Sequence, residues 1–141
     1  MHKNDLIDKT EIQVRFHEVD SMNVVWHGNY VNYLEYGRES FGEKYGINYM
    51  DFYKNKILTP IVNLELNYKK SLKYGDKFVV ETRYVDCDAA KLIFKYVIYR
   101  LSDHEVVATG KSIQVFLNTK KELLLTIPQF FLEWKEKWKI I

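Results

Sequence analysis

The segment NYVNYLEYGRESFGEKYG, residues 29–46, decides how this chain folds. Within it, large apolar residues recur at steps of three and four positions, which places them on one face of a helix. The residues of this stripe are Tyr30, Tyr33, Leu34, Gly37, Phe41 and Tyr45. Gly28 and Asn29 suit the start of such a helix, and Gly46 suits the left-handed residue that ends it. Because glycine costs about 1 kcal/mol inside a helix, Gly37 on the stripe indicates a very close approach to another backbone.

The rest of the chain reads mostly as strand. Apolar and polar residues alternate in one segment before the helix and in four segments after Pro60. The predicted strands are residues 11–18, 61–70, 78–85, 92–101 and 105–117. Short polar turns, such as residues 73–76, predict antiparallel hairpins, so we expect the four later strands to form a meander. Residues 128–139 predict a short terminal helix that packs Trp134 and Trp138 on the sheet.

One strand, one long helix and four antiparallel strands predict an α+β fold, in which a strongly curved sheet wraps around the helix. The 141 residues suit one compact domain, so we expect a single domain over residues 1–141. An open sheet leaves its edges and much aromatic surface exposed. We therefore expect a homo-oligomer, either a dimer or a tetramer.

Composition excludes several classes of protein. Cys87 is the only cysteine, so neither an intrachain disulfide nor a CxxC pair is expected, and the four histidines lack the spacing of a metal site. The 21 Lys and Arg residues nearly balance 19 Asp and Glu residues, which argues against a nucleic-acid partner. No apolar run reaches the roughly 18 residues of a membrane span. The N-terminal residues do not resemble a secretory signal, so we expect a cytoplasmic protein without membrane contact.

Two polar residues stand out around the start of the predicted helix. Asp20 follows the first predicted strand, and His27 precedes the helix seven residues later. Free N–H groups at a helix N-terminus stabilise negative charge that develops on a carbonyl oxygen. A carboxylate nearby can attack that carbonyl or take a proton from water. On spacing alone, a turn or capping role for Asp20 and a packed His27 remain the commoner alternatives.

The segment DSMNVVWHGNY, residues 20–30, resembles the signature of the 4-hydroxybenzoyl-CoA thioesterase-like family of acyl-CoA thioesterases. Glu35, Arg38 and the turn at residues 74–76 also fit the pattern of this family. The resemblance extends over nearly the whole chain and implies the hotdog fold, a curved antiparallel sheet around a long central helix. One departure is Asn23, where the family commonly has glycine. Asparagine also adopts left-handed backbone, so the departure is mild.

The resemblance also implies roles for individual residues. Asp20 corresponds to the catalytic carboxylate, acting as nucleophile or general base. His27 corresponds to the position whose backbone N–H polarises the thioester carbonyl, and its ring can assist. Lys91 lies where some members place a basic residue near the coenzyme A phosphates, although an exposed strand end is the commoner role. Three residues at the helix start are implied to bind substrate: Gly28, Asn29 and Tyr30.

These features predict an acyl-CoA thioesterase that releases a free acid and coenzyme A. No separate cofactor is expected, because coenzyme A arrives as part of the substrate. Acyl carrier protein is an alternative carrier of the thiol. Two other functions remain open: a non-catalytic module that binds acyl-CoA or acyl carrier protein, and a hotdog hydratase acting on an enoyl thioester. The sequence leaves the acyl group and the choice between nucleophile and base undecided.

Overall fold

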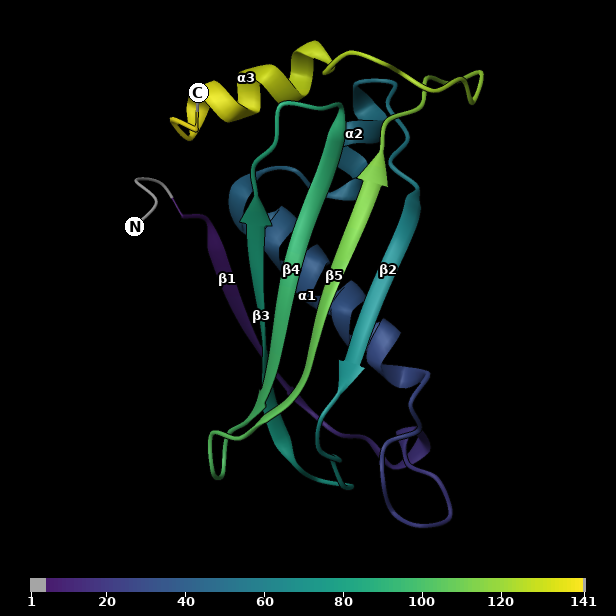
Figure 1. The fold of residues 1–141 in the computed structure, drawn as a ribbon, viewed down its shortest axis with the longest axis vertical. Coiled ribbons are helices and arrows are strands. Elements are labelled where there is room, and N and C mark those ends of the chain that lie inside the picture. Colours follow the sequence, from purple (N-terminus) through teal and green to yellow (C-terminus); the bar gives the residue numbers. More distant parts are fainter. Residues whose placement is uncertain (1–4, 141) are drawn as a thin grey trace.

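The computed structural model describes residues 5–140, which form one antiparallel sheet with helices beside it (Figure 1). The long helix α1 lies across one face of the sheet, against β1, β3 and β4. This arrangement confirms the predicted α+β fold with a curved sheet around a helix. The elements are β1 (Ile7–Gln13), a 3-10 turn (Phe16–Glu18), α1 (Asn29–Tyr45), α2 (Tyr49–Lys54), β2 (Ile61–Tyr68), β3 (Lys77–Val85), β4 (Lys91–Arg100), β5 (Val106–Val115) and α3 (Gln129–Lys137). No helix among the described residues has the length and apolar character needed to cross a membrane.

Helix α1 occupies the predicted range and buries the predicted stripe. Gly46 follows it with φ of 78°, the left-handed conformation expected at its end. The six stripe residues named above are all buried. At Gly37, an added Cβ would lie 2.6 Å from both Thr82 Oγ1 and Val80 Cγ1 of β3. The helix therefore approaches the sheet as closely as the glycine predicts, although the nearest atoms belong to side chains and not to backbone.

The predicted meander is wrong in one respect, the position of β2. The strand order is β1-β3-β4-β5-β2, so β2 pairs with β5 and lies at the edge of the sheet. The connection from β2 to β3 therefore crosses from an edge strand to an interior strand on the far side of β4 and β5, instead of forming a hairpin. Leu72 in this connection is fully buried, and its carbonyl accepts a hydrogen bond from Val25 N at 2.8 Å. A turn signal at residues 73–76 indicates where the chain changes direction, but it does not determine whether the strands on either side of the turn pair with each other.

The first strand also differs from its predicted range of residues 11–18. β1 covers Ile7–Gln13, because its partner β3 begins at Lys77, which pairs with Gln13. Beyond that point no strand lies alongside, and Phe16–Glu18 forms a 3-10 turn. The alternating pattern continues to Phe16, yet that side chain is 75% exposed. Alternation alone therefore does not show where pairing stops.

Helix α2 was not predicted. It begins with a reciprocal cap, in which the Asn48 side chain accepts from Asp51 N and the Asp51 carboxylate accepts from Asn48 N, both at 2.9 Å. The spacing of these two residues is the sequence signal for a helix start. At six residues, the helix is too short to show a clear apolar period.

The terminal helix α3 packs on the sheet and on the end of α1. The indole N–H groups of Trp134 and Trp138 both donate to the carbonyl of Tyr45, at 2.7 and 3.0 Å. Trp134 also lies edge-on to Tyr84 of β3. The last carbonyls of a helix have no partner within the helix, so these two indoles satisfy one of them. The C-terminal end of α1 is thereby held in place.

Replacing Gly37 with alanine tests the close contact between α1 and β3. We expect the clash, which typically costs about 1–3 kcal/mol, to outweigh the roughly 1 kcal/mol that alanine adds in helix propensity. The free energy of unfolding, measured by urea denaturation, should fall. Glu43→Ala, at an exposed position of the same helix, is the control for propensity. A G37A variant as stable as the wild type would show that the helix has room at this point.

Candidate active site

A short hairpin carries Asp20. The backbone N–H of Asp20 donates to Val24 O at 2.8 Å, and Trp26 N donates to Glu18 O at 2.9 Å. At the tip, Asn23 adopts φ of 60°, the left-handed backbone expected from its residue type. The hairpin leads directly into the start of α1, so Asp20 and the helix start belong to one hydrogen-bonded unit.

The carboxylate of Asp20 holds the hairpin with one of its two oxygens. Oδ1 accepts from Met22 N at 2.8 Å and from Val24 N at 3.4 Å. Oδ2 accepts no hydrogen bond from residues 5–140, and the side chain is partly exposed. The turn role and the chemical role are therefore compatible, because one oxygen holds the turn while the other is open to water or substrate.

The start of α1 has backbone donors without acceptors. No side chain in the described part of the chain caps the helix at Gly28. Asn29 N donates to Trp26 O at 2.9 Å, and Tyr30 N donates to His27 O at 3.3 Å. The N–H groups of His27 and Gly28 meet no acceptor in the described part of the chain. Such free donors, at the positive end of a helix dipole, suit a carbonyl oxygen on which negative charge develops.

Aromatic rings surround this helix start. The exposed His27 ring lies 5.1 Å from the ring of Trp26 and 6.4 Å from that of Tyr68 on β2. The Tyr68 hydroxyl donates to His27 O at 3.1 Å, which ties the helix start to the end of β2. A Cβ at Gly28 would lie 2.1 Å from the Trp26 ring, so a larger residue would displace that exposed ring from the helix start.

The other predicted residues at the helix start have structural contacts. Asn29 Nδ2 donates to Glu18 O at 2.8 Å and so links the helix to the hairpin. Tyr30 is buried, with ring centroids 5.7 Å from Tyr33 and 5.1 Å from Tyr68. Burial, opposed in part by a hydrogen bond with the backbone of Leu72, raises the pKa of Tyr30.

Lys91 does not join this cluster within one protomer. It is exposed and begins β4, whose other end lies nine residues away, about 30 Å along the strand. That other end, at Arg100, contacts Ser71 O near the hairpin side of the molecule. Lys91 therefore lies at the opposite end of the sheet from Asp20 and His27 (Figure 1).

Sequence reasoning missed Glu18. Its carboxylate is buried, and Oε1 accepts from Arg15 N at 2.8 Å and from the Tyr33 hydroxyl at 3.0 Å. Burial, and then the nearby Glu18 carboxylate, raise the pKa of Tyr33, so the hydroxyl remains a donor. Fifteen residues separate the two partners, and Glu18 stands in an alternating pattern that suggested only a strand. No local signal identifies this contact.

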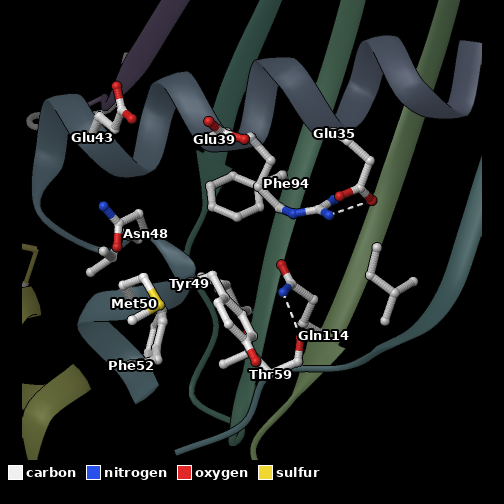
Figure 2. Close-up of a pocket in the computed structure, with 14 residues that line it drawn as sticks. Glu35, Glu39, Glu43, Asn48, Tyr49, Met50, Phe52, Thr59, Phe94 and Gln114 are labelled. Atoms are coloured by element: carbon white, nitrogen blue, oxygen red, sulfur yellow. Dashed lines mark hydrogen bonds and ion pairs between the residues drawn. The ribbon is translucent and has the colours of Figure 1, made fainter. Parts of the chain in front are cut away.

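A groove of about 620 Å³ lies along the second half of α1, next to α2 and the starts of β2 and β4 (Figure 2). Its walls include Arg38, Phe52, Ile61, Phe94 and Gln114. None of the residues predicted to be catalytic or to bind substrate lines it. Among residues 5–140, no group of three or more His, Cys, Asp or Glu side chains is arranged to hold a metal ion.

Comparison with known proteins identifies the family. Residues 14–135 match the model of the thioesterase-like superfamily. The chain belongs to this superfamily. The resemblance found in the sequence is thus confirmed, and the fold is the hotdog fold of its structural neighbours.

Individual relatives are thioesterases by name. The chain is 39% identical over 93 residues to the "Putative acyl-CoA thioesterase YneP" of Bacillus subtilis, covering 66% of this chain and 67% of that protein. It is 34% identical over 112 residues to the chloroplastic acyl-acyl carrier protein thioesterase ATL3 of Arabidopsis thaliana, and the match covers 79% of this chain but 59% of that protein. A DHNA-CoA thioesterase structure from Staphylococcus aureus superposes with a TM-score of 0.84 at 30% identity, covering 95% of this chain and 89% of that one.

Replacing Tyr33 with phenylalanine tests the contact with Glu18. The variant leaves a buried carboxylate with one donor fewer, which typically costs about 1–3 kcal/mol. We expect the free energy of unfolding to fall by this amount in urea denaturation. Tyr36→Phe removes an exposed hydroxyl from the same helix and should have little effect. Equal stability of the two variants would contradict a stabilising role for the Glu18–Tyr33 hydrogen bond.

Proposed function

We propose that this protein hydrolyses acyl-CoA thioesters to a free carboxylic acid and coenzyme A. The observation that carries the proposal is the pair of unused backbone donors at His27 and Gly28, next to the hairpin that presents Asp20. Donors of this kind stabilise the oxyanion of acyl transfer, and a carboxylate is the group that can begin the attack. The thioesterases among the relatives support the same reaction.

The roles follow from the contacts of each group. The thioester oxygen accepts hydrogen bonds from the His27 and Gly28 N–H groups, which makes the carbonyl carbon more electrophilic. The free oxygen of Asp20 then attacks that carbon to form a mixed anhydride, or takes a proton from a water molecule that attacks it. The C–S bond breaks and the thiolate of coenzyme A takes up a proton. In the anhydride route, a water molecule subsequently releases the acid.

The carrier of the acyl group is proposed to be coenzyme A. YneP is named for acyl-CoA, whereas ATL3 is named for acyl-acyl carrier protein, so the superfamily includes both carriers by name. Lys91 remains a predicted contact for the coenzyme A phosphates. Because it lies about 30 Å along β4 from the hairpin end, it would reach the site of Asp20 only from another protomer.

We also propose that the protein works as a homo-oligomer in the cytoplasm, with a dimer as the basic unit. β2 is an edge strand, so one row of its backbone groups is free to pair. Antiparallel pairing of two β2 strands around a two-fold axis would bring Tyr68 of one copy close to Ile61 of the other. Tyr68 contacts His27 and Ile61 lines the groove, so each helix start would face the groove of the second copy. A tetramer would consist of two such dimers.

Asp20→Asn tests the catalytic role of the carboxylate. The asparagine Oδ1 can still accept from Met22 N, so the hairpin should keep its shape while the charge is lost. We expect kcat/KM on acyl-CoA substrates to fall by at least about 100-fold, measured as thiol release with a disulfide reagent. Asp88→Asn, an exposed aspartate in the turn between β3 and β4, should retain activity. Activity like that of the wild type in D20N would remove Asp20 from the mechanism.

The thiol-release assay, combined with two further measurements, separates the alternative functions. Wild-type protein that binds acyl-CoA in calorimetry, but releases no thiol from a panel of chain lengths and aryl groups, would be a binding module. Loss of enone absorbance from crotonyl-CoA without thiol release would identify a hydratase. Either result would overturn the proposed hydrolysis.

Sedimentation velocity tests the proposed assembly. We expect wild-type protein to sediment with at least twice the mass of one chain. Val62, which is 59% exposed on the edge strand, should lie in or beside the new strand pair. Val62→Lys should shift the equilibrium towards monomer, because charged residues on an edge discourage pairing. A wild-type protein that remains monomeric at micromolar concentration would contradict the assembly.

A further inference from the structure

We infer that Tyr68 is a positioning residue for the oxyanion donor at Gly28, and that its hydroxyl strengthens this donor through the peptide group between His27 and Gly28. This inference rests on the proposed thioesterase function and adds a residue to its site. The His27 carbonyl and the Gly28 N–H are the two ends of one peptide group. The Tyr68 hydroxyl donates to that carbonyl at 3.1 Å, while the N–H meets no acceptor among the described residues.

The two ends of a peptide group influence each other. A hydrogen bond to the carbonyl oxygen draws electron density from the nitrogen and leaves the N–H hydrogen more positive, so hydrogen bonds in a chain strengthen one another. Such a bond also holds the plane of the peptide group, because the C–N bond resists rotation. Tyr68 therefore acts on the Gly28 donor in two ways, by polarising it and by holding the direction in which it points.

The position of Tyr68 is fixed from two sides. Its backbone lies at the end of β2, in register with Ala108 of β5. The centroid of its ring lies 5.1 Å from that of Tyr30 and 6.4 Å from that of His27, both in edge-on contact. The sheet and the two rings together keep the hydroxyl beside the His27 carbonyl.

The second proposed donor, the His27 N–H, is supported by backbone alone. It shares a peptide group with the Trp26 carbonyl, which accepts from Asn29 N at 2.9 Å. The His27 carbonyl accepts from the backbone at a longer distance, 3.3 Å from Tyr30 N. Removal of the Tyr68 hydroxyl should therefore weaken one donor and leave the other as it is.

Nuclear magnetic resonance of the free protein tests the bond directly. Among the six glycines, Gly28 is the one that follows a histidine, so ¹³C in the histidine carbonyl and ¹⁵N in glycine together identify its N–H signal. We expect Tyr68→Phe to move the Gly28 proton signal to higher field, because this hydrogen becomes less positive. His27 is likewise the one histidine that follows a tryptophan, and its N–H signal should stay in place.

Kinetics test what the bond contributes to catalysis. The oxyanion forms only in the transition state, so a weaker donor lowers kcat and leaves substrate binding nearly unchanged. Loss of a whole oxyanion donor costs roughly 100- to 1,000-fold in kcat, and Tyr68→Phe keeps the donor but weakens it. We therefore expect kcat for thiol release to fall by about ten-fold and KM to change by less than about two-fold.

Tyr74→Phe is the matched control. Tyr74 is 56% exposed, compared with 49% for Tyr68, and its hydroxyl has no hydrogen bond among the described residues. This variant should keep both the wild-type kcat and the wild-type Gly28 signal. The two variants are compared at a protein concentration at which they sediment like the wild type. If Tyr68→Phe does not fold, Tyr68→Met and Tyr74→Met take the place of the pair.

Three results would overturn the inference: an unmoved Gly28 signal in Tyr68→Phe, equal movement of the Gly28 and His27 signals, or a kcat within about two-fold of the wild-type value. Equal movement would show a general distortion of the helix start. Each of these results leaves hydrolysis itself intact. Wild-type protein that releases no thiol from any acyl-CoA would overturn the proposed function instead, and the Gly28 signal alone would then decide whether Tyr68 acts on this donor.

Discussion

The contact between α1 and the sheet is the constraint on which the rest of the molecule depends. At its centre, Gly37 lies so close to Val80 and Thr82 that no side chain fits between them. Both ends of the helix are also held, by Tyr68 bound to His27 O and by Trp134 bound to Tyr45 O. A helix fixed at three points cannot slide or tilt without breaking packing. Its N-terminal donors therefore stay beside the hairpin that presents Asp20, as the proposed catalysis requires.

The start of α1 lacks a capping side chain among the described residues. Most helices begin with a side chain that accepts from the first N–H groups, whereas Gly28 has none to offer. Asn29, the residue type that often caps a helix, instead donates to Glu18 O and joins the helix to the hairpin. The N–H groups of His27 and Gly28 consequently have no acceptor among the described residues. The carboxylate of Asp20 is similar, because Oδ1 holds the turn and Oδ2 accepts no hydrogen bond from residues 5–140.

The proposed catalytic residues and the groove occupy separate parts of the fold. The uncapped helix start supplies donors, while the groove farther along α1 supplies apolar walls and a few buried polar groups. Three glutamates of α1 line the groove, and one of them, Glu35, is paired with Arg38. β2 reaches from the groove, at Ile61, to the helix start, at Tyr68, and is one of the two edge strands of the sheet. Through this strand, pairing of two copies would place the helix start of one against the groove of the other.

The local sequence pattern determined much of the fold and the location of the candidate site. The three- and four-residue steps predicted α1 with its bounds and buried face, and the segment from Asp20 to Tyr30 marked the connection before the helix and the helix start. These features depend on residues close together in the chain. The pairing of β2 with β5, the bond from Tyr33 to Glu18 and the bond from Tyr68 to His27 emerged only in the tertiary structure. Each depends on which distant segments meet, and no spacing along the chain encodes that choice.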